Sequence, residues 1–196
     1  MKTVIIDNGH GIETAGKRSP DGQVMEYRVT RFIAHGMREQ LRAMGYNAIL
    51  LVPYDADMSL ATRAQRANHI SETNKDAILI SIHCNAASND GQWHNATGVE
   101  AYTTCGVTKA DRLAECFYEA VKEVMPDVKR RADTSDGDSD KESDLYILRK
   151  TRCPAVLTEN FFMDNIKDAQ MLSSDEGLKK IIEVHVRMVE KYFKSM

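Results

Sequence analysis

Short apolar runs alternate with longer amphipathic stretches along this chain of 196 residues. Runs rich in valine, isoleucine and leucine are typical of buried strands, whereas apolar residues at helical spacing predict amphipathic helices. The expected strands are residues 3–7, 47–52, 77–82, 98–103, 145–148 and 155–159, and the expected helices are residues 27–44, 60–73, 109–125 and 176–193. Because strands and helices alternate, the pattern favours an α/β fold with a mostly parallel or mixed sheet and helices on both faces.

The length favours one domain. A chain of 196 residues fills one core well but is short for two, and no internal repeat or linker interrupts the pattern, so we expect a single domain over residues 1–196. One segment, residues 133–144, is too polar to be buried and is interpreted as a mobile surface loop. It does not fit a calcium loop, because Ala132 and Ser143 would stand where acidic ligands belong.

Composition excludes several classes of protein. With 26 basic and 29 acidic side chains the chain has an ordinary globular balance, so we expect no nucleic-acid partner. The apolar run at residues 3–6 is too short for a secretory or membrane segment, so we expect synthesis in the cytoplasm and no membrane association. The four cysteines form no CxxC pair and are expected to be free thiols.

Polar residues follow three of the predicted strands directly. The first strand runs into Asp-Asn-Gly-His-Gly ending at Gly11, the third into Ser-Ile-His-Cys-Asn ending at Asn85, and the last into Glu159. Ligands of open α/β sheets bind beyond the carboxyl ends of the strands. His10, His83 and Glu159 are therefore expected to converge on one edge of the sheet.

Two histidines and one carboxylate match a catalytic zinc site that leaves a fourth position open. We assign the carboxylate to Glu26, at the start of the first helix, where the loop from His10 returns. Zinc lowers the pKa of a bound water towards ~7, and Glu159 is the candidate base and acid that moves protons during hydrolysis. Gly9 and Gly11 are expected to let the backbone turn sharply enough to aim the imidazole of His10.

Each of these residues also has a simpler interpretation. A single histidine at a strand end is more often structural, and an acidic residue in the first helical turn is expected from the helix dipole. Together, however, the four residues at one sheet edge favour a metal site over four separate structural roles.

The other histidines and Cys84 are weaker candidates. His35 and His185 lie within helices and are expected at the surface or in packing, and His94 is a weaker candidate for substrate contact. Cys84 is expected to point away from His83.

The ordered motifs resemble the zinc-dependent N-acetylmuramoyl-L-alanine amidases of autolysins, spore-wall enzymes and phage lysins, from Val4 to about Leu172. They are Asn-Gly-His-Gly at residues 8–11, Leu-x-x-Arg-x-x-x-Ala-Asn at 60–68, Ser-Ile-His-x-Asn-Ala at 81–86, Gly-x-Glu-x-Tyr at 98–102 and Pro-Ala-Val-Leu-x-Glu-x-x-Phe-x-x-Asn at 154–165. The resemblance implies a six-stranded sheet with flanking helices and hydrolysis of the amide between the muramoyl lactyl group and L-alanine of peptidoglycan. It also implies one Zn²⁺ held by His10, Glu26 and His83, with Glu159 catalytic.

The motifs add four weaker candidates. Arg63 and Asn85 are expected to support the site. The basic pair Lys17 and Arg18 in the first loop is a candidate for binding a stem-peptide carboxylate, with a plain surface turn as the alternative. The chain departs from the family at its start, where Asp-Asn-Gly-His-Gly-Ile replaces the usual Asp-Pro-Gly-His-Gly-Gly, but no ligand is lost.

Two other functions remain open. The same metal chemistry would serve a zinc carboxypeptidase or endopeptidase that cuts within the stem peptide. A wall-binding module without turnover is a different class, and retention of all three ligands and Glu159 argues against it. We expect peptidoglycan as the partner and assume a monomer. The protein could reach the wall by release through a helper pore, as phage lysins do, or by export as an autolysin.

Overall fold

A six-stranded sheet runs through the middle of the molecule, as predicted. The structure is a computed structural model, and residues 1–135 and 137–196 are described. In spatial order the strands are β2 (Asn47–Leu50), β1 (Thr3–Asn8), β3 (Ala77–Asn85), β6 (Ala155–Phe162), β4 (Val99–Thr103) and β5 (Lys141–Glu142). The sheet is mixed: β2, β1, β3 and β6 are parallel to one another, whereas β4 is antiparallel to β6 and parallel to β5.

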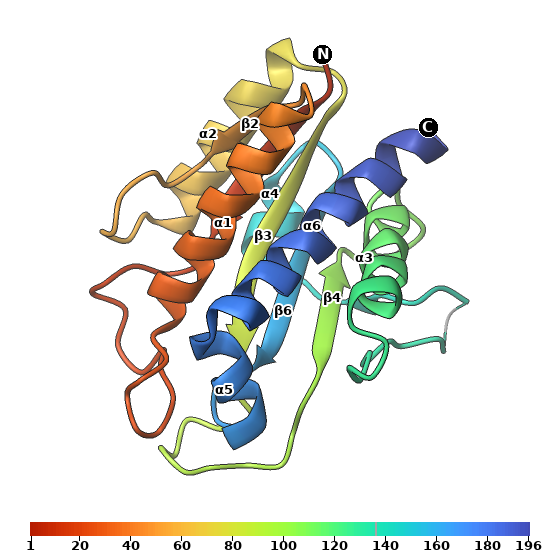
Figure 1. Ribbon diagram of the computed structural model, residues 1–196. Coiled ribbons are helices and arrows are strands. Elements are labelled where there is room, and N and C mark those ends of the chain that lie inside the picture. Colours follow the sequence, from red (N-terminus) through yellow and green to blue (C-terminus); the bar gives the residue numbers. More distant parts are fainter. Residues whose placement is uncertain (136) are drawn as a thin grey trace.

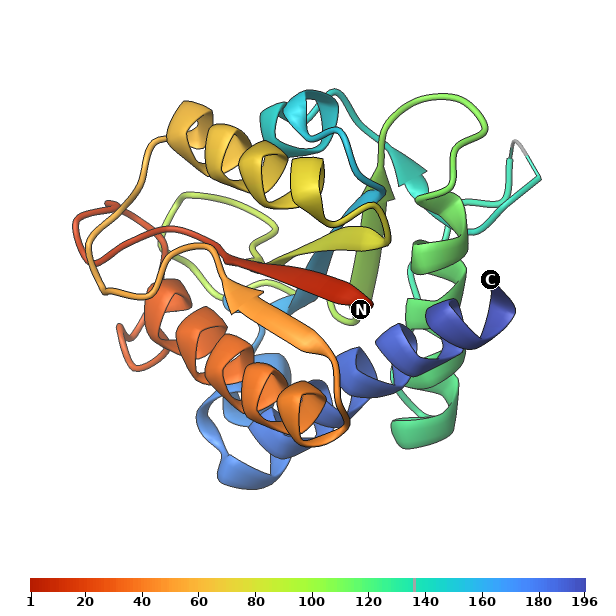
Figure 2. The same cartoon turned by 90° about the horizontal axis from the view of Figure 1, so that it is seen from above.

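Helices cover both faces of the sheet, which confirms the predicted layers (Figures 1 and 2). The helices α1 (Glu26–Ala43), α3 (Asp111–Val124) and α6 (Asp175–Ser195) lie on one face, where α5 (Ile166–Ser173) packs against α6. The other face carries α2 (Leu60–Thr73) and α4 (Tyr146–Lys150). None of the described helices is both long and apolar enough to cross a membrane.

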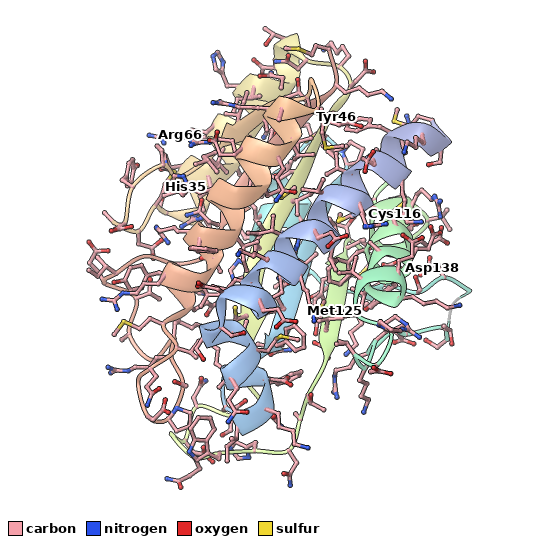
Figure 3. All side chains as sticks on the ribbon, in the orientation of Figure 1. His35, Tyr46, Arg66, Cys116, Met125 and Asp138 are labelled. Carbon is pink, nitrogen blue, oxygen red and sulfur yellow. The ribbon has the colours of Figure 1, made fainter. Side chains whose placement is uncertain are left out.

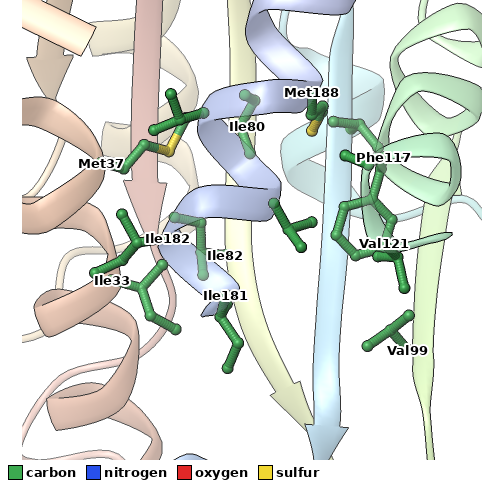
Figure 4. Close-up of a cluster of buried hydrophobic side chains, with 14 of the residues drawn as sticks. Ile33, Met37, Ile80, Ile82, Val99, Phe117, Val121, Ile181, Ile182 and Met188 are labelled. Atoms are coloured by element: carbon green, nitrogen blue, oxygen red, sulfur yellow. The ribbon is translucent and has the colours of Figure 1, made fainter. Parts of the chain in front are cut away.

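The core divides into two clusters because side chains alternate across each strand. On β3, Ile80 and Ile82 face the larger cluster with α1, α3 and α6, whereas Leu79 faces α2 and α4. Figure 4 shows Ile80 and Ile82 beside Ile182 and Met188 of α6. Each fully buried side chain of this size contributes roughly 1.5–3 kcal/mol to folding. Both layers are therefore held to the sheet mainly by aliphatic burial.

Stacked aromatic rings hold the end of α1 against the end of α6. The ring of Tyr46, in the turn after α1, stacks on Phe193 with the centroids 5.7 Å apart (Figure 3). The Nζ of Lys2 lies 5.1 Å from the centroid of the Phe193 ring and also donates to the Phe193 carbonyl oxygen. The two ends of the chain are thereby joined at one side of the molecule.

The predicted strand at residues 145–148 is wrong. Residues 146–148 lie in α4, with Leu145 directly before its first turn, and the fifth strand is instead β5, which pairs with β4. The apolar run is too short for its periodicity to distinguish a strand from a helix. A helical turn allows Ile147 and Leu148 to be buried together against one face of the sheet, whereas a strand would point them to opposite faces.

The acidic segment 133–144 is only partly the surface loop that its composition predicts. Asp140 is buried, and its carboxylate accepts a hydrogen bond of 2.5 Å from the hydroxyl of Thr103. One carboxylate oxygen of Asp140 has this donor, whereas its Oδ1 is buried without a hydrogen-bond partner among the described residues. The next two residues form β5, so this part of the segment belongs to the sheet; residue 136, within the same prediction, lies outside the described residues.

The helix α5 is absent from the sequence-based prediction. Its start is marked by Asn165, whose side-chain oxygen accepts hydrogen bonds from the backbone nitrogens of Lys167 and Asp168 at 3.0 and 3.2 Å. An asparagine at the position before the first turn is a recognised N-cap signal, and it is the feature from which α5 could have been predicted. The carboxylate of Asp168 in turn accepts from the backbone nitrogens of Gly98 and Phe162, which ties α5 to β6 and to the start of β4.

Both predicted alternatives for the helical histidines occur, one for each residue. His185 packs in the core within α6, whereas His35 on α1 is exposed (Figure 3). The Nδ1 of His185 donates to the carbonyl oxygen of Ile181 at 2.8 Å, and its Nε2 accepts from the hydroxyl of Thr158 at 2.9 Å. A carbonyl only accepts, which fixes this tautomer. Burial lowers the pKa of His185 to about 4, so the folded protein holds the ring neutral.

We predict that His185 makes the protein acid-sensitive. Because its folded pKa lies below the unfolded value near 6.5, the unfolded state binds more protons as the pH falls from 6.5 to 4, and stability decreases over that window. The loss is about 3 kcal/mol when complete. Urea unfolding from pH 7 to 4 should show a shallower pH slope for His185→Gln than for the wild type. The exposed His69→Gln is the control and should keep the wild-type slope; equal slopes for His185→Gln and the wild type would contradict the prediction.

Candidate metal centre and active site

His10, Glu26 and His83 come together at the carboxyl ends of β1 and β3, as predicted. One donor atom from each side chain lies within 4.8 Å of the other two. The Nδ1 of His83 is 3.1 Å from Oε1 of Glu26, and the Nε2 of His10 is 3.4 Å from Oε2 of the same carboxylate. The two imidazole rings meet edge to face, with centroids 5.0 Å apart.

Each residue of the cluster is positioned by a different element. His83 is part of β3, His10 lies in the loop directly after β1, and Glu26 is the first residue of α1. The backbone nitrogen of Glu26 donates to the carbonyl oxygen of Lys17, so the loop from His10 is closed at the start of the helix. Oε1 of Glu26 also accepts from the backbone nitrogen of Cys84 at 3.0 Å, which fixes the carboxylate against β3.

The glycines beside His10 act differently from the prediction. The residue with a left-handed backbone is His10 itself, with φ 59°, whereas neither Gly9 nor Gly11 has a positive φ. Gly9 is required by close approach, since a Cβ there would lie 2.4 Å from Cε1 of His83. A Cβ on Gly11 would lie 2.2 Å from the backbone nitrogen of Asp57. Gly9 therefore makes room for the imidazole of His83, and Gly11 for the backbone at Asp57. The strained backbone angle is that of His10 itself.

Arg63 of α2 anchors the loop that carries His10. Its guanidinium is 2.6 Å from Oδ1 of Asp7 and 2.9 Å from Oδ1 of Asp57, and it donates to the carbonyl oxygen of Asn8 at 2.7 Å. The other carboxylate oxygen of Asp7 accepts from the hydroxyl of Ser81 at 2.7 Å. Arg63 therefore supports the site through the backbone carbonyl groups of Asn8 and, at 3.4 Å, of His10 itself.

The electrostatics suit a cation. Burial lowers the pKa of His10 to about 4, so its imidazole is neutral at pH 7. Burial opposes ionisation of both Glu26 and His83, but their hydrogen bond favours it, and the pKa of Glu26 moves down while that of His83 moves up. Oε2 of Glu26 is buried without a hydrogen-bond donor among the described residues. A buried, unpartnered carboxylate oxygen between two imidazoles fits the nitrogen and oxygen donor set of zinc.

Glu159 lies beside the ligand cluster. It is paired in register with His83 across β6 and β3, so the two side chains are neighbours on one face of the sheet. Burial raises the pKa of Glu159 to about 8, and its Oε2 has no hydrogen-bond partner in the described part of the chain. Phe161, two residues further on, has φ 65° and marks an irregularity where β6 shifts register against β3. Among the described non-glycine residues, His10 and Phe161 are the two with positive φ, and both adjoin this site.

The remaining candidates lie around the cluster. The amide of Asn85 donates to Glu100 on β4 at 2.8 Å, which places Asn85 in a neighbouring polar network. Lys17 and Arg18 are exposed and line a pocket of about 450 Å³ together with residues 86–92. His94 has its Nε2 3.0 Å from Oδ1 of Asp90 and is not among the cluster. Cys84 is buried in the larger core cluster, so it points away from His83 as expected.

Comparison with known proteins agrees with this geometry. A family model described as N-acetylmuramoyl-L-alanine amidase matches residues 4–191. This chain belongs to that family. The amidase CwlM of Bacillus licheniformis is 29% identical over 194 residues, which cover 98% of this chain and 69% of CwlM. The endolysin of Bacillus phage SPP1 is 27% identical over 187 residues, which cover 94% of this chain and 63% of the endolysin.

The fold of the amidase family is also the fold of this chain. The crystal structure of the N-acetylmuramoyl-L-alanine amidase from Clostridium difficile 630 superposes with a TM-score of 0.85 at 26% sequence identity, covering 98% of this chain and 97% of that one. Beside the cluster, the present chain has a pocket of about 420 Å³ whose lining includes His10, His83 and residues 57–60 and 145–147. Space for a substrate therefore adjoins the ligand cluster directly.

We predict that Gly9→Ala weakens metal binding by the cluster. The added methyl group overlaps the ring of His83, so the ring must shift from its position beside Glu26. Changes that misplace a ligand in this way typically cost ~10- to 100-fold in metal affinity. Competition with a chelating dye measures the effect. Gly45→Ala is the matched control, because its Cβ meets open space although φ is 88°: it should lose about 1 kcal/mol of stability and keep its zinc affinity. Unchanged affinity in Gly9→Ala would show that the close approach is not limiting.

Proposed function

We propose that this amidase-family protein hydrolyses the amide between the muramoyl lactyl group and L-alanine in peptidoglycan, and that it depends on zinc. The observation that carries the proposal is the cluster of His10, Glu26 and His83 next to Glu159, which is half-buried and whose Oε2 is buried without a hydrogen-bond partner among the described residues. Such a cluster provides three protein ligands and one proton-transfer group, which is the set that metal-assisted amide hydrolysis requires. Family membership supports the choice of amide.

His10, Glu26 and His83 would hold the zinc. When bound, zinc supplies a Lewis acid that polarises the carbonyl group and lowers the pKa of a water molecule. The surrounding contacts hold the ligands in place: the carbonyl oxygen of His83 accepts from the amide of Asn160 at 3.0 Å, and the hydroxyl of Thr30 donates to the carbonyl oxygen of Gly9 at 3.1 Å. The ligand set is therefore organised by the sheet and by α1 before any substrate arrives.

Glu159 would move the protons of the reaction. A carboxylate beside the ligands accepts a proton from the attacking water and then donates it to the leaving alanine nitrogen. Burial raises the pKa of Glu159 towards neutral pH, the range in which one side chain can serve first as base and then as acid. Because β6 holds Glu159 in register with His83, its distance from the metal ligands is set by strand pairing.

Other assignments are less well supported. A peptidase that cuts within the stem peptide would use the same ligands, but the relatives named above are amidases or an endolysin. A module that only binds the wall would have no use for a buried, unpartnered carboxylate, which is costly to maintain. A monomer, synthesis in the cytoplasm and phage-type release to the wall are further proposals; fractionation of producing cells and light scattering would test them.

We predict that Glu159→Gln retains zinc and loses activity. The amide cannot accept and return a proton, so kcat should fall by ~10²- to 10⁴-fold while the three ligands remain. Zinc content is measured by atomic absorption and hydrolysis by release of stem peptides. Glu26→Gln is the comparison variant and should lose zinc together with activity. If Glu159→Gln lost zinc as well, Glu159 would be a ligand instead.

We predict that digestion of purified peptidoglycan creates new amino groups only at N-terminal L-alanine. Cleavage of the lactyl amide releases intact stem peptides and leaves reducing sugar ends unchanged. Labelling of the new amino termini, followed by hydrolysis and chiral amino-acid analysis, identifies the cleaved bond. New termini at D-alanine or at the diamino residue would favour the peptidase, and new reducing ends would exclude an amidase because they require glycosidic cleavage.

A further inference from the structure

A second polar network lies next to Glu159 on the side away from the metal ligands. Glu100 of β4 is paired in register with Glu159 of β6, as Glu159 is with His83 of β3. The three side chains therefore form a row across one face of the sheet, from His83 through Glu159 to Glu100. Glu100 is buried, with 3% of its surface exposed.

Two cations converge on Glu100. Its Oε1 accepts from Nε of Arg131 at 2.6 Å and from Nζ of Lys141 at 2.7 Å, while its Oε2 accepts from Asn85 and from the hydroxyl of Tyr102. Two cationic side chains thus share one carboxylate. Asp133 also feels the charge of Lys141, but its carboxylate is exposed and accepts from the backbone nitrogen of Ser135. Taken together, buried Glu100 and its two part-exposed cations carry one positive charge in excess.

Arg131 presents the part of its guanidinium that Glu100 does not use. Its side chain is 30% exposed, and its Cζ lies 5.2 Å from the centroid of the Phe162 ring. In residues 1–135 and 137–196 we find no hydrogen bond from either of its terminal nitrogens. A guanidinium held by Nε and by a ring, with both terminal nitrogens available, has the geometry for bidentate binding of a carboxylate.

We propose that Arg131, assisted by Lys141, binds a carboxylate of the substrate on the peptide side of the scissile amide. The inference rests on the proposed function, because it places the scissile carbonyl between the metal ligands and Glu159. Neighbouring strands are about 4.8 Å apart, so the cations beyond Glu100 lie roughly 5–10 Å from Glu159 along the row. An extended peptide advances about 3.5 Å per residue, so the α-carboxyl group of the second stem residue reaches that position.

The charge and the chemistry of the site select this group. A single excess positive charge matches one carboxylate. If the α-carboxyl group of the second stem residue is amidated, the resulting neutral amide offers the guanidinium only one weaker acceptor. The glycan strand has no carboxylate at that distance once its lactyl group is engaged in the scissile amide. We therefore expect the protein to prefer stem peptides whose second residue carries a free α-carboxyl group over those in which this group is amidated.

The test uses two peptidoglycan preparations that differ only in this group, free or amidated. For the wild-type protein with zinc, kcat/KM for release of stem peptides should be about tenfold higher on the free acid. In Arg131→Gln the preference should fall to less than about twofold, and Lys141→Gln should lie between the two. The ratio is measured on one preparation of each variant, so partial loss of folded protein cancels.

The matched control is Arg130→Gln, which removes the same charge from an exposed neighbour that forms no ion pair among the described residues. It should keep the wild-type ratio. Equal rates of the wild type on both preparations, or a tenfold preference that survives in Arg131→Gln, would overturn this inference and assign the two cations only to neutralising Glu100. Failure to release stem peptides from either preparation would instead contradict the proposed function.

Discussion

Parallel pairing of β3 with β1 on one side and β6 on the other is the constraint on which the site depends. The backbone nitrogen of Gly9 donates to the carbonyl oxygen of Ile82, which continues the β1 ladder up to the residue before His10. On the other side of β3, register places Glu159 opposite His83. Strand pairing thereby brings together groups that are more than seventy residues apart in sequence. A slip of one residue would turn either side chain to the other face.

The sequence contains enough information to predict that His10, Glu26 and His83 lie together, because each follows a local signal. His10 and His83 stand at the ends of apolar runs, and Glu26 begins an amphipathic helix to which the first loop must return. The role of Gly9 could not be predicted in the same way, because it depends on which side chain lies opposite, and that is decided by sheet register. The partners of Glu100 are equally non-local, since they come from residues 85, 131 and 141. The error at residues 145–148 has a different origin, since four apolar residues carry too little periodicity to distinguish helix from strand.

The site contains several features that are costly to fold. His10 and Phe161 adopt backbone angles that typically cost of order 1–3 kcal/mol each, and buried oxygens of Glu26 and Glu159 lack hydrogen-bond partners among the described residues. Aliphatic burial by helices on both faces offsets these costs, since the central strands contribute residues with almost no exposed surface to both core clusters. The unfavourable groups remain ordered because they are attached to the most heavily packed strands.

The lengths of the outer strands have a consequence for solubility. The sheet ends in β2, with four residues, and in β5, with two, whereas the central β3 has nine. At the β2 side, Nε of Arg42 donates to the carbonyl oxygen of Ala48, and a guanidinium nitrogen of Arg66 donates to that of Leu51 (Figure 3). Long unpaired edges are templates for strand addition by other molecules. Short edge strands whose carbonyl groups already accept from arginine side chains offer few free backbone groups to a second copy of the chain. This protects an otherwise strongly apolar sheet from self-association through its edges.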